Sequence, residues 1–361
     1  MNEVPEISTL ANILGGKIGE LPTTYLGMPL GAKCKSKNIW NSVVERCENK
    51  LVNWRSQYLS LGGRVTLINS VLDAMPTYMM SLFLIHGKII KKLDAIRRNF
   101  LWQGNGEGEK KHHLVKWEAV ITTKKEGGLG IKNLKAQNKS LLLKWLWRLA
   151  ADEQGLWKEI IIARYGREGP WTTQEVKTPY ERGLWRTIRN QWQKMWGNFV
   201  IKLGNGRKTM FWNDVWVGQT PLRQQFPNIY NLNQQKLATI LEFYNTLEQA
   251  KSLNFEEDKL LWKLDKDGKF RVKAAYKLLD ISIETKEWCP WKMIWKGTIP
   301  HKVACFTWLV ANQAVLTQDN LMKRGRQLCS RCFFCEAEIE TVNHLFLHCK
   351  VIENYGNGSL I

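Results

Sequence analysis

Long apolar runs are missing from this chain of 361 residues. Its longest apolar stretches, 79–85 and 141–143, are too short or too interrupted by Lys to cross a bilayer. The first residues, Met-Asn-Glu-Val-Pro, lack the basic start and apolar core of a secretory signal. We therefore expect a protein that neither spans a membrane nor is secreted.

Acidic residues are scarce relative to basic ones. The chain has 53 Lys and Arg against 33 Asp and Glu, which gives a net charge of +20. Between residues 33 and 148 there are 22 basic and 8 acidic residues, so this third of the chain holds a net charge of +14. Such a surplus indicates a polyanionic partner, either nucleic acid or an anionic membrane face. The alternative is a basic surface that serves no partner.

The rest of the composition is that of a globular protein. Apolar residues make up 44% of the chain and charged residues 24%, and its length allows two or three domains. The 18 tryptophans are predicted to lie mostly in the core. In a reducing compartment, the 8 cysteines indicate metal binding more than disulfides where they cluster.

Helical periodicity dominates the first two thirds of the chain. After an extended segment of about thirty residues, helices are predicted over 40–54, 64–75, 88–102, 141–149, 156–165 and 184–196. Gly62-Gly63 is expected to end the first of them, and Pro76 to break the second. Further helices are predicted over 273–279, after Pro300, and after Thr317.

Small β-hairpins are expected near residue 198 and beyond. The first would join 199–203 to 209–212 through Asn205-Gly206, and the second would join 260–264 to 270–272 through Asp267-Gly268. The predicted fold class is therefore mainly α with small β-hairpins, an α+β chain that ends in a small metal-binding module.

Basic residues spread over two faces of the helix at 88–102 and recur after it. They could follow the phosphates of a nucleic-acid backbone, or form an ordinary solvated face. The candidate nucleic-acid-binding residues are Lys88, Lys91, Lys92, Arg97, Arg98, Lys110 and Lys111.

The strongest chemical signal lies near the C-terminus. Cys332, Cys335, His344 and Cys349 form the pattern C-x2-C-x8-H-x4-C, which suits one tetrahedral zinc ion. Cys329 and His348 are alternative ligands, because Cys329 also forms a CxxC with Cys332. Four protein ligands leave no open position, so we expect Zn²⁺ in a structural role. Such an ion contributes on the order of 10 kcal/mol to folding.

Several stretches resemble the reverse transcriptases of plant LINE-type (non-LTR) retrotransposons. The segment LPTTYLGMPLG at 21–31 resembles the chain just after the palm, and so do the motifs that follow it. These are LVNWR at 51–55, YLSLGGRVTLI at 58–68, FLW at 100–102 and GGLGI at 127–131. FWNDVW at 211–216 and FRVKAAY at 270–276 are similar to that family's linker, and 291–349 to its zinc-binding domain.

The resemblance implies a domain organisation. A post-palm segment would occupy 1–34, a thumb-like helical region 35–104, a helical connection 105–197 and a linker 198–268. The zinc-binding domain would occupy 269–351 and a tail 352–361. The family's thumb grips a template–primer duplex, which would place the basic helix at 88–102 against phosphate. The family also implies a nuclear location.

No pair of adjacent aspartates occurs in the sequence. Nucleotidyl transfer needs metal ions held by clustered carboxylates, which this family supplies from a palm upstream of Leu21. The resemblance thus implies a non-catalytic, nucleic-acid-binding part of a polymerase. The alternatives are a truncated record of a complete RNA-directed DNA polymerase, or the product of a decayed element without selected function. The sequence does not decide between RNA and DNA, and does not predict the oligomeric state.

Overall fold

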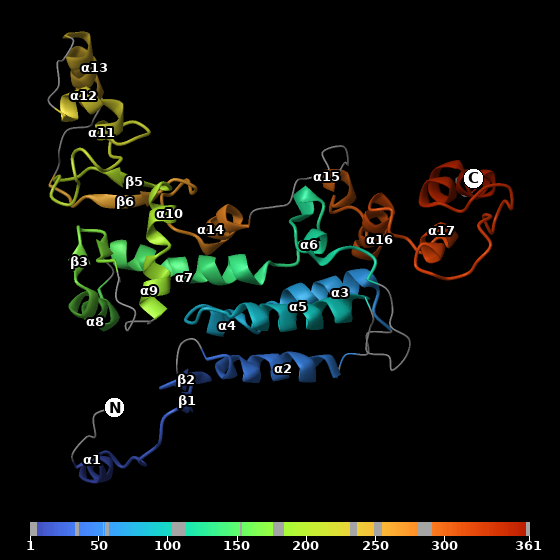
Figure 1. Ribbon diagram of the computed structural model, residues 1–361, viewed down its shortest axis with the longest axis horizontal. Helices are drawn as coiled ribbons and strands as arrows, with labels where there is room; N and C mark the ends of the chain where they lie inside the picture. Colours follow the sequence, from blue (N-terminus) through green and yellow to red (C-terminus); the bar gives the residue numbers. More distant parts are fainter. Residues whose placement is uncertain are drawn as a thin grey trace. The chain divides into compact units, whose positions relative to one another are not determined.

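A computed structural model describes residues 6–32, 36–52, 54, 58–102, 113–151, 154–175, 184–231, 237–248, 255–280 and 291–358. Helices dominate, and three two-stranded antiparallel sheets accompany them, so the predicted fold class is confirmed (Figure 1). Backbone proximity divides the chain into two compact units. Within the described ranges, no helix combines the length and the apolar content that a membrane span requires.

The first unit comprises residues 1–39, 79–85 and 135–280. Its helices are α1 (Ile7–Leu14), α7 (Leu134–Ala150, from its second residue), α8 (Leu156–Tyr165), α9 (Leu184–Arg189), α10 (Trp192–Trp196), α11 (Leu222–Gln225), α12 (Pro227–Tyr230), α13 (Leu237–Glu248) and α14 (Val272–Leu279). Its strands are β1 (Thr23–Tyr25), β2 (Met28–Leu30), β3 (Arg167–Glu168), β4 (Thr172–Thr173), β5 (Phe199–Lys202) and β6 (Lys259–Trp262).

A tryptophan-rich core fills the first unit. The antiparallel pair β5–β6 sets Phe199 opposite Trp262, and apolar residues of α7, α9, α10 and α14 pack around them. Trp262 is 1% exposed, with its ring centroid 5.1 Å from that of Phe199 and 5.2 Å from that of Phe270. None of the described tryptophans is exposed, as the composition predicts.

The second unit comprises residues 40–78, 86–134 and 281–361. Its elements are α2 (Asn41–Val52), α3 (Leu61–Leu67), the π-helix η3 (Ile68–Leu72), α5 (Gly87–Trp102), α6 (Trp117–Val120), η4 (Lys124–Glu126), α15 (Trp291–Ile294), α16 (His301–Ala311), α17 (Gln318–Met322), the π-helix η5 (His344–His348) and α18 (Lys350–Gly358). The short helices η1 (Asn38–Trp40) and α4 (Thr77–Met80) cross the boundaries between the units.

Two glycines let the C-terminal helices of the second unit pack closely on its N-terminal elements. A Cβ on Gly62 would lie 3.0 Å from His301 of α16, and a Cβ on Gly127 would lie 2.7 Å from Trp291 of α15. His301 Nδ1 donates to the Gly62 carbonyl at 3.2 Å, and Trp308 Nε1 donates to the Gly127 carbonyl at 2.7 Å. Helices α15 and α16 therefore pack against α3 and the Gly127 end of η4 within this unit.

The predicted helices at 40–54, 88–102, 156–165 and 273–279, and the helix after Pro300, are confirmed within a residue or two at most of their ends. Three local predictions are wrong. Residues 7–14 form a helix within the segment expected to be extended. Gly62-Gly63 lies in the first turn of α3, where Ser60 Oγ accepts from the Gly63 N–H. Residues 184–196 form two helices instead of one, with a turn at residues 190–191 between them.

Both predicted hairpins are also wrong in their pairing. β5 pairs with β6, more than fifty residues away, instead of with 209–212. The loop with Asn205-Gly206 instead surrounds the buried Asp258, whose carboxylate accepts from the N–H groups of Gly204 at 2.7 Å and Lys208 at 2.8 Å. The second predicted hairpin, between 260–264 and 270–272, does not form, because Val272 begins α14 instead of ending a strand. In the ranges that the structure describes, the strands joined as hairpins are β1–β2 and β3–β4.

Candidate metal centre

The first half of the candidate centre is a tight turn around the CxxC. Arg331 and Ile339 pair as an isolated antiparallel bridge. Within the turn, the Cys332 N–H donates to the Glu338 carbonyl at 2.7 Å, and the Glu336 N–H donates to the Cys332 carbonyl at 2.9 Å. Because these bonds fold the turn back on itself, both thiols point to the same side of it.

The second half is a short helical segment that supplies the other two ligands. The His344 N–H bonds Thr341 Oγ1 at 3.1 Å at the start of η5. Cys349 follows the last residue of η5, and its carbonyl accepts from the Glu353 N–H at 2.9 Å as α18 begins. One turn of π-helix thus sets the spacing between His344 and Cys349.

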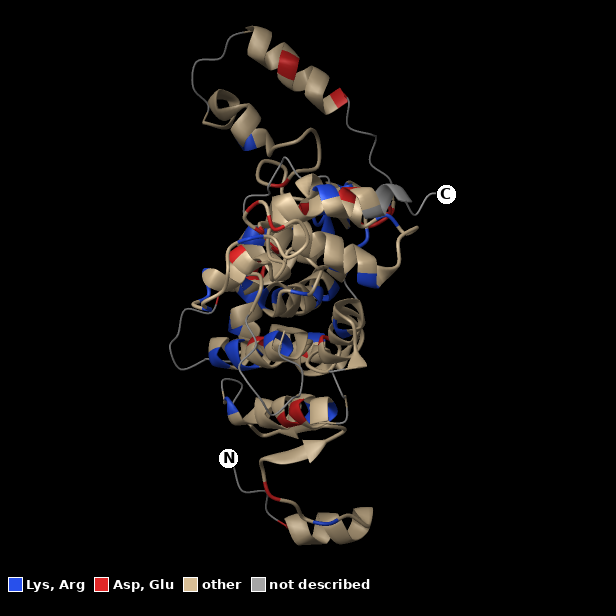
Figure 2. Ribbon diagram, turned by 90° about the vertical axis from the view of Figure 1, so that its right-hand side faces the viewer, with Lys and Arg blue, Asp and Glu red and all other residues tan. Residues whose placement is uncertain are grey.

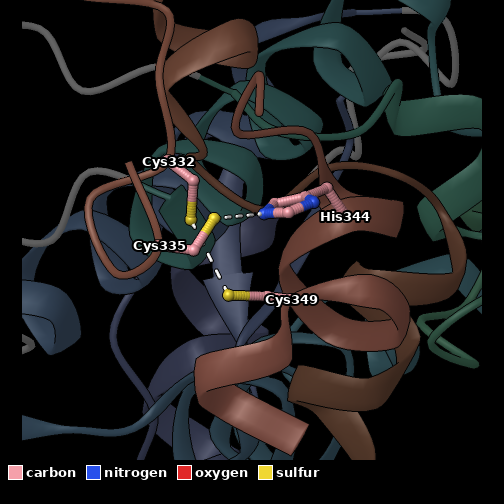
Figure 3. Close-up of side chains that lie close together, drawn as sticks. All are labelled: Cys332, Cys335, His344 and Cys349. Carbon is pink, nitrogen blue, oxygen red and sulfur yellow. Dashed lines mark hydrogen bonds between the residues drawn. The ribbon is translucent and has the colours of Figure 1, made fainter. Parts of the chain in front are cut away.

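The four side chains converge on one point, as Figure 3 shows. One ligand atom from each of Cys332, Cys335, His344 and Cys349 lies within 4.8 Å of all the others. Cys335 Sγ is 3.2 Å from His344 Nε2, and Cys332 Sγ is 4.0 Å from Cys349 Sγ. A tetrahedral zinc ion with Zn–S bonds of about 2.3 Å separates its ligand atoms by roughly 3.5–3.8 Å. The residues present therefore fit zinc.

Burial and outer hydrogen bonds prepare these side chains for a metal. Cys332, His344 and Cys349 are buried. His344 Nδ1 lies 3.0 Å from Glu338 Oε2, which orients the ring so that Nε2 faces the thiols. Burial raises the pKa of the Cys332 thiol. The N–H of Ala337, and then that of Glu338, help to lower the pKa of the Cys335 thiol to about 6, which favours the thiolate that binds metal.

The two alternative ligands lie outside this cluster. Cys329 is an exposed free thiol, and His348 is exposed at the other end of η5 from His344. Neither belongs to the group of side chains that could hold an ion, and no other such group of three or more occurs among the described residues. The structure thus brings together Cys332, Cys335, His344 and Cys349.

Sequence reasoning missed two glutamates that shape the centre. Glu338 orients His344, and the buried Glu340 accepts from the N–H groups of Gln318 at 3.2 Å and Phe333 at 3.1 Å. In the sequence, glutamates occupy every second position from 336 to 340, between the CxxC and His344. This pattern could have predicted a carboxylate partner for His344, because metal-bound histidines commonly donate to a carboxylate.

The basic candidates on α5 divide into two groups. Lys88, Lys91 and Lys92 are exposed, Lys92 within 3.4 Å of Glu48, and Arg98 is half-buried. Arg97 is a correction: it is 3% exposed, pairs with the buried Asp73 at 2.6 Å and also bonds Asp94. Its guanidinium holds α5 in place and does not face solvent. Lys110 and Lys111 lie outside the described residues.

Comparison with known proteins agrees with this centre. Residues 270–355 match the family described as zinc-binding in reverse transcriptase. A putative ribonuclease H protein of Arabidopsis thaliana is 29% identical over an alignment of 363 residues. The alignment covers 89% of this chain and 56% of the relative. An uncharacterised mitochondrial protein of the same plant is 28% identical over 151 residues, which cover 41% of this chain and 97% of the relative.

These findings establish two things. The chain carries a zinc-binding domain of the reverse-transcriptase type, and its four clustered ligands suit one ion, so the predicted zinc cofactor is confirmed. The chain is similar to plant proteins, and it spans little more than half, 56%, of the length of the first of them.

Proposed function

We propose that this protein binds nucleic acid as a non-catalytic part of a LINE-type retrotransposon reverse transcriptase, with zinc in a structural role. The observation that carries the proposal is the Cys3His cluster within a segment that matches the reverse-transcriptase zinc-binding family. Four protein ligands complete a tetrahedral zinc site, so the ion would organise the chain and not act on a substrate.

The exposed lysines of α5 supply the proposed phosphate contacts. Lys88, Lys91 and Lys92 lie on a helix that Arg97 fixes to Asp73, in the same compact unit as the Cys3His cluster. Figure 2 shows the basic residues in blue and the fewer acidic residues in red. In the proposal, the thumb-like region 35–104 and the zinc-binding domain 269–351 hold one template–primer together. Phosphate contacts do not distinguish RNA from DNA.

The test is the affinity of the purified protein for a structured RNA and for a primer–template duplex across a salt series. Each phosphate engaged contributes about 0.9 to the negative log–log slope for a duplex. The variant K88Q/K91Q/K92Q should reduce that slope by about two to three. The matched control K194Q/K202Q/K266Q removes the same charge from exposed lysines of the first unit, outside both proposed binding regions, and should leave the slope nearly unchanged.

Two outcomes would count against the proposal. Binding no stronger than to an unrelated polyanion such as heparin, with little salt dependence, would favour the product of a decayed element. Primer extension by the purified chain would instead favour the enzyme reading, a complete polymerase. The first relative is named for ribonuclease H, and no observation on the described residues favours that activity here. A nuclear location is part of the proposal, and imaging of a fluorescent fusion tests it.

A further inference from the structure

In the described part of the chain, the exposed aromatic side chains are phenylalanines and tyrosines. None of the described tryptophans is exposed. By contrast, Phe333 is 77% exposed and Phe334 50% exposed, and both lie between the two cysteines of the CxxC. Large apolar side chains at the tip of a fixed turn contribute little to a core, so their exposure indicates a binding role.

The turn holds these two rings in defined positions. Cys332 and Cys335 on either side would be fixed by the metal, and the Phe333 N–H donates to the buried Glu340 at 3.1 Å. The two rings contact each other edge to face, with centroids 5.7 Å apart and planes at 87°. Because the backbone is fixed at three points, little conformational entropy is lost when the rings bind a ligand.

The segment that leads to the rings is basic. Residues 321–335 contain four basic residues and no acidic one. Arg326 and Arg331 are exposed, and Arg331 directly precedes Cys332. Of the three glutamates that follow, Glu336 is exposed, Glu338 is exposed and contacts His344, and Glu340 is buried against backbone N–H groups. An anionic ligand with flat apolar faces matches this combination of charge and rings.

We propose that Phe333 and Phe334 stack on unpaired bases of single-stranded nucleic acid, while Arg326 and Arg331 contact its phosphates. This inference rests on the proposed function and adds a strand preference to it. Base faces are accessible to aromatic side chains only where the bases are unpaired, so a duplex would not engage the rings. Stacking tolerates any base, so no sequence preference is expected from these contacts.

The experiment compares binding of a 12-nucleotide single strand containing 2-aminopurine with binding of the same sequence as a duplex. Each stacked base is worth on the order of a 5- to 100-fold change in affinity. F333A/F334A should therefore lose about ten-fold or more in single-strand affinity, with an unchanged salt slope and less than about two-fold change for the duplex. Quenching of 2-aminopurine fluorescence should disappear together with that affinity.

Three controls make the result specific. F333Y/F334Y keeps both rings and should retain wild-type affinity. F255A removes an exposed Phe of the first unit and should change nothing. One zinc per chain in each variant shows that the turn still folds.

Single-strand affinity that survives in F333A/F334A would overturn the inference and leave the proposed function intact. Full affinity of F333L/F334L would also overturn it, because it would mark a generally apolar docking surface. A wild-type protein that binds neither probe would refute the proposed function itself.

Discussion

The tryptophan core of the first unit and the zinc-binding turn of the second use aromatic side chains in opposite ways. In the first unit, Trp262, Phe199 and Phe270 are packed ring against ring, and Trp262 is 1% exposed. In the turn, Phe333 and Phe334 face solvent. The two regions differ in what stabilises them, which determines whether an aromatic ring is free to bind a ligand.

Burial stabilises the tryptophan core. A fully buried large apolar side chain contributes about 1.5–3 kcal/mol, so a core of this kind needs its rings inside. The segment 331–349 buries few apolar side chains of its own, Val342 among them. A bound zinc ion supplies on the order of 10 kcal/mol there instead. The exposed rings of Phe333 and Phe334 are therefore not needed for folding.

Loss of the metal should give the largest difference between the two regions. In C332S, or after chelation, we expect 329–349 to lose its structure, because about 10 kcal/mol of local stabilisation disappears. The tryptophan core should keep its protection. Hydrogen exchange measured by mass spectrometry checks both. The matched control is C329S, which removes an exposed thiol outside the cluster and should keep one zinc per chain. Zinc loss in C329S would show that the ligands are assigned wrongly.

Truncation of a core ring should have the reverse effect. W262A should lower the free energy of unfolding of the first unit by about 3–5 kcal/mol, since it removes a fully buried ring and leaves a cavity. W262F, which keeps a ring beside Phe199, should lose less. Zinc affinity should be the same in both variants. A stability of W262A within about 1 kcal/mol of wild type in denaturant titration would contradict the assigned core.

A methyl group at Gly127 should disturb only the second unit. G127A would place a Cβ 2.7 Å from Trp291 at a residue with φ +93°, so we expect a loss of about 2 kcal/mol or more. The control G15A has a similar positive φ of +63° but no atom within 4 Å, and should lose about 1 kcal/mol or less. Equal losses in thermal unfolding would mean that the close approach of α15 is unimportant.

Asp258 should give the first unit a response to strong acid. Burial alone would raise the pKa of the Asp258 carboxyl. Hydrogen bonds to the carboxylate outweigh this effect and hold the pKa below its usual value; they come from the N–H groups of Gly204, Gly206 and Lys208 and from the Thr209 hydroxyl. A lowered carboxyl pKa stabilises the fold above about pH 4, and this contribution is lost as the pH falls through the folded-state pKa. D258N should cost about 2 kcal/mol at pH 7. The exposed D267N should cost less than about 0.5 kcal/mol in the same denaturant titration.

His301 should give the second unit a smaller response in weaker acid. Burial, and then the nearby Lys124, lower its pKa below the usual value. The unfolded chain then binds a proton that the folded chain lacks, so stability is complete above about pH 6.5 and decreases as the pH falls below it. In H301Q, we expect the loss of unfolding free energy between about pH 7.5 and pH 5 to be smaller than in the wild type, by less than about 1 kcal/mol. Thermal unfolding across this pH range measures the difference. An unchanged pH profile in H301Q would rule out this role.

Local patterns predicted much of this fold, and their failures have a common cause. The helix at 88–102 and the ligand spacing of Cys332, Cys335, His344 and Cys349 depend on neighbours in sequence. The pairing of β5 with β6 and the burial of Arg97 beside Asp73 depend on residues far along the chain. Asn205-Gly206 had the composition of a hairpin turn, but Asp258 accepts the hydrogen bonds of that loop. Periodicity contains no information about such distant partners.

The exposure of Phe333 and Phe334 could not be predicted from the sequence either. Aromatic residues are usually buried, and only the position of the turn shows that these two are not.

The most direct test of the account is a zinc titration of the metal-free protein in the presence of a labelled single strand. We predict that single-strand affinity rises by about ten-fold or more and saturates at one zinc per chain, because the metal fixes the turn that carries Phe333 and Phe334. Equal single-strand affinity of the metal-free and the zinc-loaded protein would contradict the claim that the metal-held turn is a binding surface.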